Sequence, residues 1–273
     1  MRIEQGEMDA PTFERFRSLI YERSGITLGD GKRALLVSRL GGRMRELAIT
    51  TYREYLEFVL SDAGDEIVRL LDAISTNVTS FFREPTHFTF LERDFRSRLQ
   101  NGARRYRVWS AAASSGEEPY TIAMTLHESL PAPPPDVKIL ATDISTRVLA
   151  RCREGVYESE KLKNVPVELR RRHFAEVADA QLPSLRVKDH LRQMIRFARL
   201  NLATPPFPMT GSFDVIFCRN VMIYFDPQIK KNLVTDMHRL LRPDGFLIIG
   251  HAESLNGLDV PYRLVEPAVY ARA

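Results

Sequence analysis

Glu117 and Glu118 follow a run of small residues, and together these features restrict the ligand that this part of the chain could bind. The β-prone segment 107–110 (RVWS) leads into AAASSG, and Pro119 suits the first position of a helix, where its missing N–H has no partner. Small side chains let a ligand approach the loop backbone, as in nucleotide-binding folds. Two carboxylates at the helix entrance would repel a pyrophosphate, and the Gly-x-Gly-x-x-Gly spacing is absent. A neutral or cationic nucleoside fits better.

A further acid follows the next β-prone run. Residues 137–141 lead into Thr142 and Asp143, and an acid in this position commonly accepts hydrogen bonds from ribose hydroxyls. S-adenosylmethionine (SAM), which joins a ribose to a sulfonium cation, satisfies both requirements. An ordinary strand–helix–strand unit with solvated acids at its strand ends explains the segment equally well.

An arginine lies where the character of the chain changes, in the segment 76–85 (TNVTSFFREP). Helical periodicity precedes this segment, and alternating strands and helices follow it. Arg83 is therefore predicted at a junction between two domains, where ligand sites form, and its guanidinium is suited to meet an anion. Phe81 and Phe82 are better explained as core residues.

Polar residues also end the apolar run 213–218, which predicts a strand buried on both faces of a parallel sheet. Cys218, Arg219 and Asn220 lie at its carboxyl end, where open α/β sheets bind ligands, and Tyr224 follows. A satisfied loop amide and a packing ring are ordinary explanations for Asn220 and Tyr224. Their coincidence with the segments described above favours a shared site.

These residues are carried by two kinds of predicted structure. Residues 1–76 contain four amphipathic helices, the third of which begins with the capping-box pair Thr51 and Glu54. From about residue 105 strands alternate with helices, which predicts an α/β doubly wound, mostly parallel sheet. The alternation stops between 153 and 199, where buriable apolar residues favour a small antiparallel β insertion over a surface loop.

Composition narrows the class of protein. The 273 residues are 44% hydrophobic and 27% charged, with a net charge of +4, which is typical of a soluble globular protein. The slight positive charge would suit nucleic acid or an acidic protein. Cys152 and Cys218 are too few for a disulfide scaffold or a structural zinc site, which favours a reducing cytoplasm. The sequence has neither a long apolar run nor the apolar core of a signal peptide, so neither secretion nor membrane insertion is predicted.

Basic side chains gather on the second predicted helix. At roughly 100° per residue, Lys32, Arg39 and Arg43 fall in one stripe, with Arg33 and Arg45 nearby. This stripe could contact an acidic protein surface. A solvated helix face has the same appearance.

Together these segments resemble the CheR family of chemotaxis receptor-glutamate methyltransferases. The motifs are TNVTSFFRE at 76–84, RVWSAAASSGEEPY at 107–120, ATDI at 141–144, LNL at 200–202, FDVIFCRNVMIYF at 213–225 and RPDGFLIIGHAE at 242–253. The resemblance implies a helical receptor-recognition domain at 1–76. It further implies a SAM-binding domain of the class I methyltransferase type at 77–273, with a β subdomain inserted at about 153–199.

The resemblance also implies roles for individual residues. Those matching the family's cofactor site are Asn77, Thr79, Arg83, Glu118, Asp143, Asn201, Leu202, Cys218, Arg219 and Asn220. Arg83 and Tyr224 match residues that contact the reacting centre. Arg33, Arg39 and Arg43 match arginines that contact the receptor's methylation region.

The implied activity is methylation of glutamates on the cytoplasmic helices of methyl-accepting chemotaxis receptors, for sensory adaptation. It would use SAM and release S-adenosylhomocysteine, without a metal, in a cytoplasmic monomer that binds no nucleic acid. Segment 175–184 lacks the glycines found in relatives that grip a receptor C-terminal peptide, so such tethering is not predicted.

Two other functions remain as alternatives. A nucleic-acid methyltransferase would suit the basic pI, although no Asn/Asp-Pro-Pro-Tyr/Phe sequence follows the strand at 213–218. The other alternative is a non-catalytic SAM-binding scaffold. Arg83 and Tyr224 argue against a scaffold, because cofactor binding alone would not require both.

Overall fold

The computed structural model describes residues 8–61, 65–74, 78–178 and 182–273. Up to residue 74 the described elements are α1 (Ala10–Ser24), η1 (Asp30–Lys32), α2 (Arg33–Glu46), α3 (Tyr52–Ser61) and α4 (Asp65–Ile74). Their apolar faces form a separate core around Phe16, Leu40 and Tyr55. The capping box is confirmed, because Thr51 and Glu54 each bind the other's backbone N–H at 3.2 Å.

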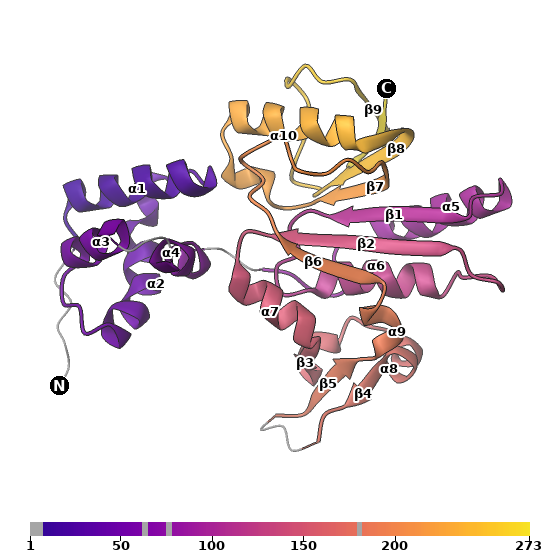
Figure 1. Ribbon diagram of the computed structural model, residues 1–273, viewed down its shortest axis with the longest axis horizontal. Helices are drawn as coiled ribbons and strands as arrows, with labels where there is room; N and C mark the ends of the chain where they lie inside the picture. Colours follow the sequence, from indigo (N-terminus) through magenta and orange to yellow (C-terminus); the bar gives the residue numbers. More distant parts are fainter. Residues whose placement is uncertain (1–7, 62–64, 75–77, 179–181) are drawn as a thin grey trace.

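The main sheet has the strand order β6-β2-β1-β7-β8-β10-β9 within the described residues (Figure 1). Its strands are β1 (Arg105–Ser110), β2 (Asp136–Asp143), β6 (Ile195–Arg199), β7 (Phe213–Cys218), β8 (Leu241–Ile249), β9 (Tyr262–Glu266) and β10 (Val269–Arg272). All neighbours from β6 to β8 pair in parallel, while β10 and β9 are antiparallel. The chain winds outward from β1 first toward β6 and then toward β8, as a doubly wound sheet does.

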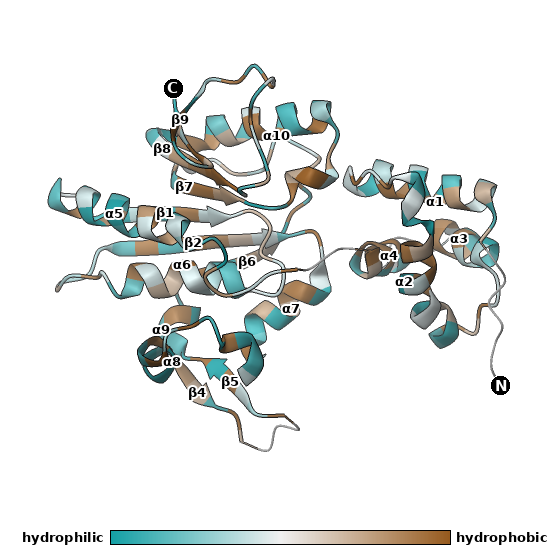
Figure 2. Ribbon diagram, turned by 180° about the vertical axis from the view of Figure 1, so that it is seen from behind, coloured by the Kyte–Doolittle hydropathy of each residue, from teal (hydrophilic) through white to brown (hydrophobic). Residues whose placement is uncertain are grey.

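Helices cover both faces of this sheet, and strand side chains alternate between them. On one face, Val108 packs in a core with α5 (Thr86–Gln100) and α6 (Glu117–His127). On the other face, Trp109 packs in a core that includes α10 (Pro227–Leu240). Figure 2 shows hydrophobic residues along β7 and β8 between these layers. The sheet is therefore buried on both sides, as the apolar run at 213–218 predicted.

The loop between β1 and α6 is shaped by Gly116, which has a φ of 100°. A Cβ there would lie 2.5 Å from the Tyr157 hydroxyl, so only glycine fits. Helix α6 begins at Glu117, so Pro119 occupies its third position and not the first. A missing N–H is still harmless there, because the first four N–H groups of a helix lack intrahelical partners.

The predicted antiparallel insertion is present as a second sheet of order β3-β5-β4. It follows α7 (Thr146–Glu154) and contains β3 (Val156–Glu158), η2 (Ser159–Leu162), α8 (Val167–His173), β4 (Phe174–Glu176), β5 (Ser184–Val187) and α9 (Asp189–Arg192). The predicted end of the insertion near 199 was wrong, because β6 pairs in parallel with β2. At the edge of the main sheet, β6 has half-buried Ile195 and Phe197 on either side of exposed Arg196, as a hairpin strand also would.

The helical part meets the α/β part at the end of α1. Gly25 has a φ of 71°, and a Cβ on it would lie 2.4 Å from the Cβ of Ala203. The Tyr21 hydroxyl donates to Asp226 at 2.5 Å, and the Thr27 N–H donates to the carbonyl of Tyr224 at 2.9 Å. Backbone and side-chain hydrogen bonds thus join the two parts directly. Among the described helices, none has the length and apolar character to cross a membrane.

Candidate active site

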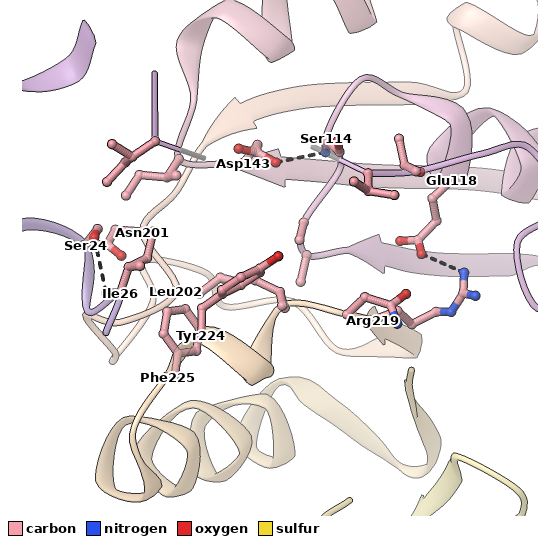
Figure 3. A pocket seen from close by; sticks show the side chains of 18 of the residues that line it. Ser24, Ile26, Ser114, Glu118, Asp143, Asn201, Leu202, Arg219, Tyr224 and Phe225 are labelled. Atoms are coloured by element: carbon pink, nitrogen blue, oxygen red, sulfur yellow. Dashed lines mark hydrogen bonds and ion pairs between the residues drawn. The ribbon is translucent and has the colours of Figure 1, made fainter. Parts of the chain in front are cut away.

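A pocket opens at the carboxyl ends of β1, β2 and β7, where the direction of winding changes. Figure 3 shows side chains from several loops facing it. From the α/β part, its lining includes Ala111, Ala112, Ser114, Glu118, Asp143, Ile144, Leu200, Asn201, Leu202, Arg219, Asn220, Val221, Tyr224 and Phe225. The three segments that the sequence singled out at strand ends therefore meet around one cavity.

Asp143 is held in a fixed orientation at the end of β2. One carboxylate oxygen accepts the N–H of Ser114 at 2.9 Å, and the other accepts the N–H of Ser145 at 2.9 Å. Ser114 has a φ of 49°, in the left-handed region that few non-glycine residues adopt. Burial raises the pKa of Asp143 to about 6, although both N–H bonds lower it. At pH 7 the carboxylate is ionised and has lone pairs left for hydroxyl donors.

Arg219 connects the loop after β7 to two carboxylates. Its side chain is 2% exposed; Nη1 donates to Glu118 at 2.9 Å, and Nη2 pairs with Glu84 at 3.0 Å. Burial acts to raise the pKa of both carboxyl groups, and the charge of Arg219 acts to lower it. For Glu84 the hydrogen bond and charge of Arg219 outweigh burial, so its pKa is lowered overall. For Glu118 burial prevails and the pKa is raised overall. The ion pairs fix the entrance of α6 against the end of β7.

The loop that carries Tyr224 is held by Glu253. This carboxylate accepts the N–H groups of Asn220 at 2.7 Å, Met222 at 2.8 Å and Gly250 at 2.8 Å. Asn220 has a φ of 57°, so the chain turns sharply after β7 and enters η3 (Met222–Tyr224). Figure 3 shows the Tyr224 ring on the side of the pocket opposite Asp143. The motif HAE at 251–253 thus has a structural role that sequence reasoning did not assign.

Comparison with known families now identifies the chain. Residues 77–270 match the family described as "CheR methyltransferase, SAM binding domain", and residues 11–75 match "CheR methyltransferase, all-alpha domain". The chain belongs to the CheR methyltransferase family. The predicted family, the methyltransferase fold and a SAM-dependent enzyme are confirmed.

Relatives of the same family are similar over nearly their whole length. The chemotaxis protein methyltransferase of Escherichia coli (strain K12) is 41% identical over 260 residues, which covers 95% of this chain and 90% of the relative. Chemotaxis protein methyltransferase 2 of Pseudomonas aeruginosa is 41% identical, covering 96% and 92%. The Borreliella burgdorferi chemotaxis protein methyltransferase is 38% identical, covering 94% and 93%.

Most residues that the CheR resemblance assigned to the cofactor line the pocket. They are Thr79, Arg83, Glu118, Asp143, Asn201, Leu202, Arg219 and Asn220. Cys218 does not, because its side chain is fully buried in the core beside α10. Asn77 lies outside the described residues. The pocket thus gathers residues from the ends of several strands and from the segment that precedes α5.

Arg83 lies at this pocket in a half-buried position. Its Nη1 donates to the carbonyl of Val78 at 2.8 Å, and its own carbonyl accepts from Arg219 at 2.5 Å. Its neighbours Phe82 and Glu84 have φ values of 54° and 56°. The backbone around Arg83 is therefore specifically shaped, as is common at functional sites.

The helical part of the CheR chain also contributes to the pocket, which the sequence did not predict. The lining residues that come from the helical part are Ser24, Ile26, Thr27, Leu28, Lys32, Leu35 and Ile74. Apart from Lys32, which the basic stripe included, these are ordinary apolar or hydroxyl residues without a motif. Tertiary contacts bring them to the α/β part, among them the close approach of Gly25 to Ala203 and the hydrogen bond from Thr27 to the carbonyl of Tyr224.

The three arginines predicted to contact the receptor differ in their surroundings. Arg39 is exposed on α2, and Arg33 is half-buried. Arg43 binds Glu66 through two hydrogen bonds of 2.9 and 2.7 Å, and the Glu66 side chain is only 3% exposed. Arg43 therefore has a structural partner that Arg39 lacks in the described ion pairs.

Proposed function

We propose that this CheR family member methylates glutamate side chains of chemotaxis receptors with SAM, giving glutamyl methyl esters and S-adenosylhomocysteine for sensory adaptation. The observation that carries the proposal is one pocket that combines Asp143, Arg83 and Tyr224 at the carboxyl ends of the strands. Relatives that cover the whole chain are chemotaxis protein methyltransferases, which supports this choice of substrate.

The residues of the pocket fit SAM by their chemistry. Asp143 is ionised at pH 7 and oriented by two N–H donors, as a carboxylate that binds ribose hydroxyls should be. Ala111 and Ala112 are small enough for an aromatic base to approach the backbone. The carboxylate of Glu118 favours a cationic ligand. SAM supplies an activated methyl group on sulfur, and the chain's own residues supply its position.

The acceptor needs little acid–base assistance. A glutamate side chain is already ionised at pH 7, so no general base is required. The task of the enzyme is to align the acceptor oxygen with the methyl group in a partly dry pocket. We assign orientation of the acceptor carboxylate to Arg83 and a supporting hydrogen bond to Tyr224. A stronger Arg83 pair would stabilise the ground state as well as the transition state, without gain in rate.

The receptor would approach over the helical part, where Arg39 presents its charge to solvent. Arg33 and Arg43 remain candidates for the same surface. We further propose that the protein acts in the cytoplasm, where the methylated receptor helices lie, and that neither a metal nor an oligomer is needed for the transfer.

The test incubates purified protein with methyl-labelled SAM and membranes that contain chemoreceptors of its host. Base-labile label on the receptor band, absent when the receptor glutamates are changed to alanine, is the expected result. Label that resists base, or that appears on added RNA, would overturn the receptor assignment in favour of a nucleic-acid substrate. Tight SAM binding without transfer to any acceptor would indicate a scaffold.

A further inference from the structure

Three histidines meet far from the pocket, at the far end of α6. His127 is the last residue of α6, His173 is the last residue of α8, and His190 lies in α9. Their ring centroids are 4.7 to 5.3 Å apart. One ring nitrogen from each lies within 4.8 Å of the others. Figure 1 shows α8 and α9 beside this end of α6.

The hydrogen bonds of the cluster leave one buried nitrogen without a partner among the described residues. Nδ1 of His173 lies 2.9 Å from Nε2 of His190, and its Nε2 lies 2.8 Å from a carboxylate oxygen of Glu128. Nδ1 of His127 is buried with no hydrogen-bond partner among the described residues. The nearest carboxylate oxygen, on Glu128, is 3.9 Å away, which is too far for a hydrogen bond. A buried polar atom in this state usually indicates an absent ligand or water.

We propose that His127, His173 and His190 bind a divalent transition-metal ion of the zinc class. Three imidazoles and one open position form a common tetrahedral zinc site. Imidazole nitrogen suits zinc, copper and nickel far better than magnesium or calcium.

Glu128 supports this arrangement from outside the ligand set. By accepting from Nε2 of His173, it leaves the other ring nitrogen, Nδ1, on the side of His190. A carboxylate behind a ligating histidine is the usual outer partner in zinc sites, where it fixes the tautomer and the ring plane. The sequence-based expectation of no metal came from the family resemblance, and the cysteine count argued against a structural zinc site. It could not register histidines scattered between residues 127 and 190.

The surrounding charges are compatible with a cation. Arg172 pairs with the other oxygen of Glu128, and Lys188 is turned toward backbone carbonyls of α8 at 3.0 Å.

A metal here would connect the inserted subdomain to the cofactor domain. Helix α6 begins at Glu117 and Glu118 beside the pocket and ends at His127, whereas α8 and α9 belong to the inserted segment. The ion would fix the orientation of the second sheet relative to α6. This role does not depend on the proposed methyl transfer, so either can fail without the other.

The test titrates untagged, chelator-treated full-length protein with Zn²⁺ by calorimetry, and with Co²⁺ followed by absorbance. We expect one ion per chain and tetrahedral Co²⁺ bands. Substitutions H127Q and H190Q affect half-buried positions and should each weaken Zn²⁺ binding by about 100-fold, while H238Q on α10 should not. Zn²⁺ should raise the melting temperature of the unsubstituted protein and of H238Q only.

A second group of possible metal ligands, Glu84, His87 and His251, is the alternative zinc site that the test must distinguish. The cation of Arg219 lies beside it, which disfavours a metal there. If H251Q abolishes Zn²⁺ binding while H127Q and H190Q leave it intact, the proposal is wrong. Absence of saturable Zn²⁺ binding to the unsubstituted protein would also overturn it.

Discussion

Arg219 and Glu118 form a buried ion pair in which Nη1 and Oε2 lie 2.9 Å apart, although 101 residues separate them in the chain. The same guanidinium holds Glu84 and the carbonyl of Arg83. Arg219 therefore positions three segments of the pocket wall at once. The family resemblance assigns Arg219 to the cofactor, which predicts a loss of SAM affinity on substitution. The positioning role predicts a loss of stability as well.

Removal of Arg219 should destabilise the whole protein. The substitution R219Q leaves buried Glu118 and half-buried Glu84 without their cation, which costs about 3 to 5 kcal/mol in the free energy of unfolding. Urea unfolding followed by circular dichroism measures this loss. The matched control is R196Q, because Arg196 is exposed on the edge strand β6. Equal midpoints for R219Q and the unsubstituted protein would contradict the positioning role.

The affinity for SAM should depend on the ionisation of Asp143. Its pKa of about 6 means that the carboxylate becomes protonated as the pH falls below 6, and one acceptor for ribose is lost. If only the ionised form binds, the dissociation constant rises by about tenfold at one pH unit below that pKa. Calorimetric titration with SAM between about pH 7 and pH 5 tests this, and D143N should bind weakly without the pH dependence.

Without cofactor, the same group should affect stability in the opposite direction. A raised pKa means that the folded protein binds the Asp143 proton more readily than the unfolded chain does. The stability that it contributes is present below the unfolded value near 3.8 and is lost as the pH rises through about 6. Comparison of D143N with the unsubstituted protein in urea at both ends of this range isolates the effect. Identical pH profiles would contradict the raised pKa.

Substitution of Arg83 should affect transfer more than cofactor binding. We expect R83A to lower kcat by about 100-fold, because the acceptor is no longer aligned, while the SAM dissociation constant changes by only a few-fold. R83K, which keeps the charge but not the fork geometry, should recover part of the rate. Single-turnover methylation and calorimetry provide the two readouts. Parallel losses in both would instead make Arg83 a cofactor-binding residue.

The two arginines of the basic stripe should respond differently to substitution. R39E reverses an exposed charge and should raise the KM for receptor by about tenfold without loss of stability. R43A removes the two hydrogen bonds and the charge that Arg43 supplies to buried Glu66 and should destabilise the protein by about 3 kcal/mol. Steady-state methylation and thermal unfolding distinguish the two effects. R53E, at an exposed position of α3, is the control for net charge.

Local patterns predicted the elements whose boundaries are set by local chemistry. Thr51 and Glu54 start α3 through reciprocal hydrogen bonds, and Asp226 caps α10 by accepting from Ile229 at 2.8 Å. Strand β7 is buried throughout, so its apolar run matched its bounds. Motifs also predicted much of the pocket lining, since the ends of parallel strands share one edge of a sheet.

Features created by tertiary contacts were not predictable in this way. Strand β6 has the period of a hairpin strand, and only its pairing with β2 shows that it belongs to the main sheet. Cys218 adjoins two lining residues in the chain, but strand alternation directs its side chain into the core. The Thr27 contribution to the pocket depends on how the helical part docks. The sequence around Thr27 contains no motif that predicts this docking.

The hydrogen bond from Thr27 to the carbonyl of Tyr224 also constrains how this protein can be re-engineered. A chimera that borrows residues up to about 74 from a relative, in order to change receptor preference, would import one wall of the cofactor pocket as well. Gly25 and Ala203 would have to be exchanged together for the two surfaces to fit. In the receptor-recognition role proposed for the helical part, a substitution at this contact would therefore affect both the choice of receptor and the affinity for cofactor.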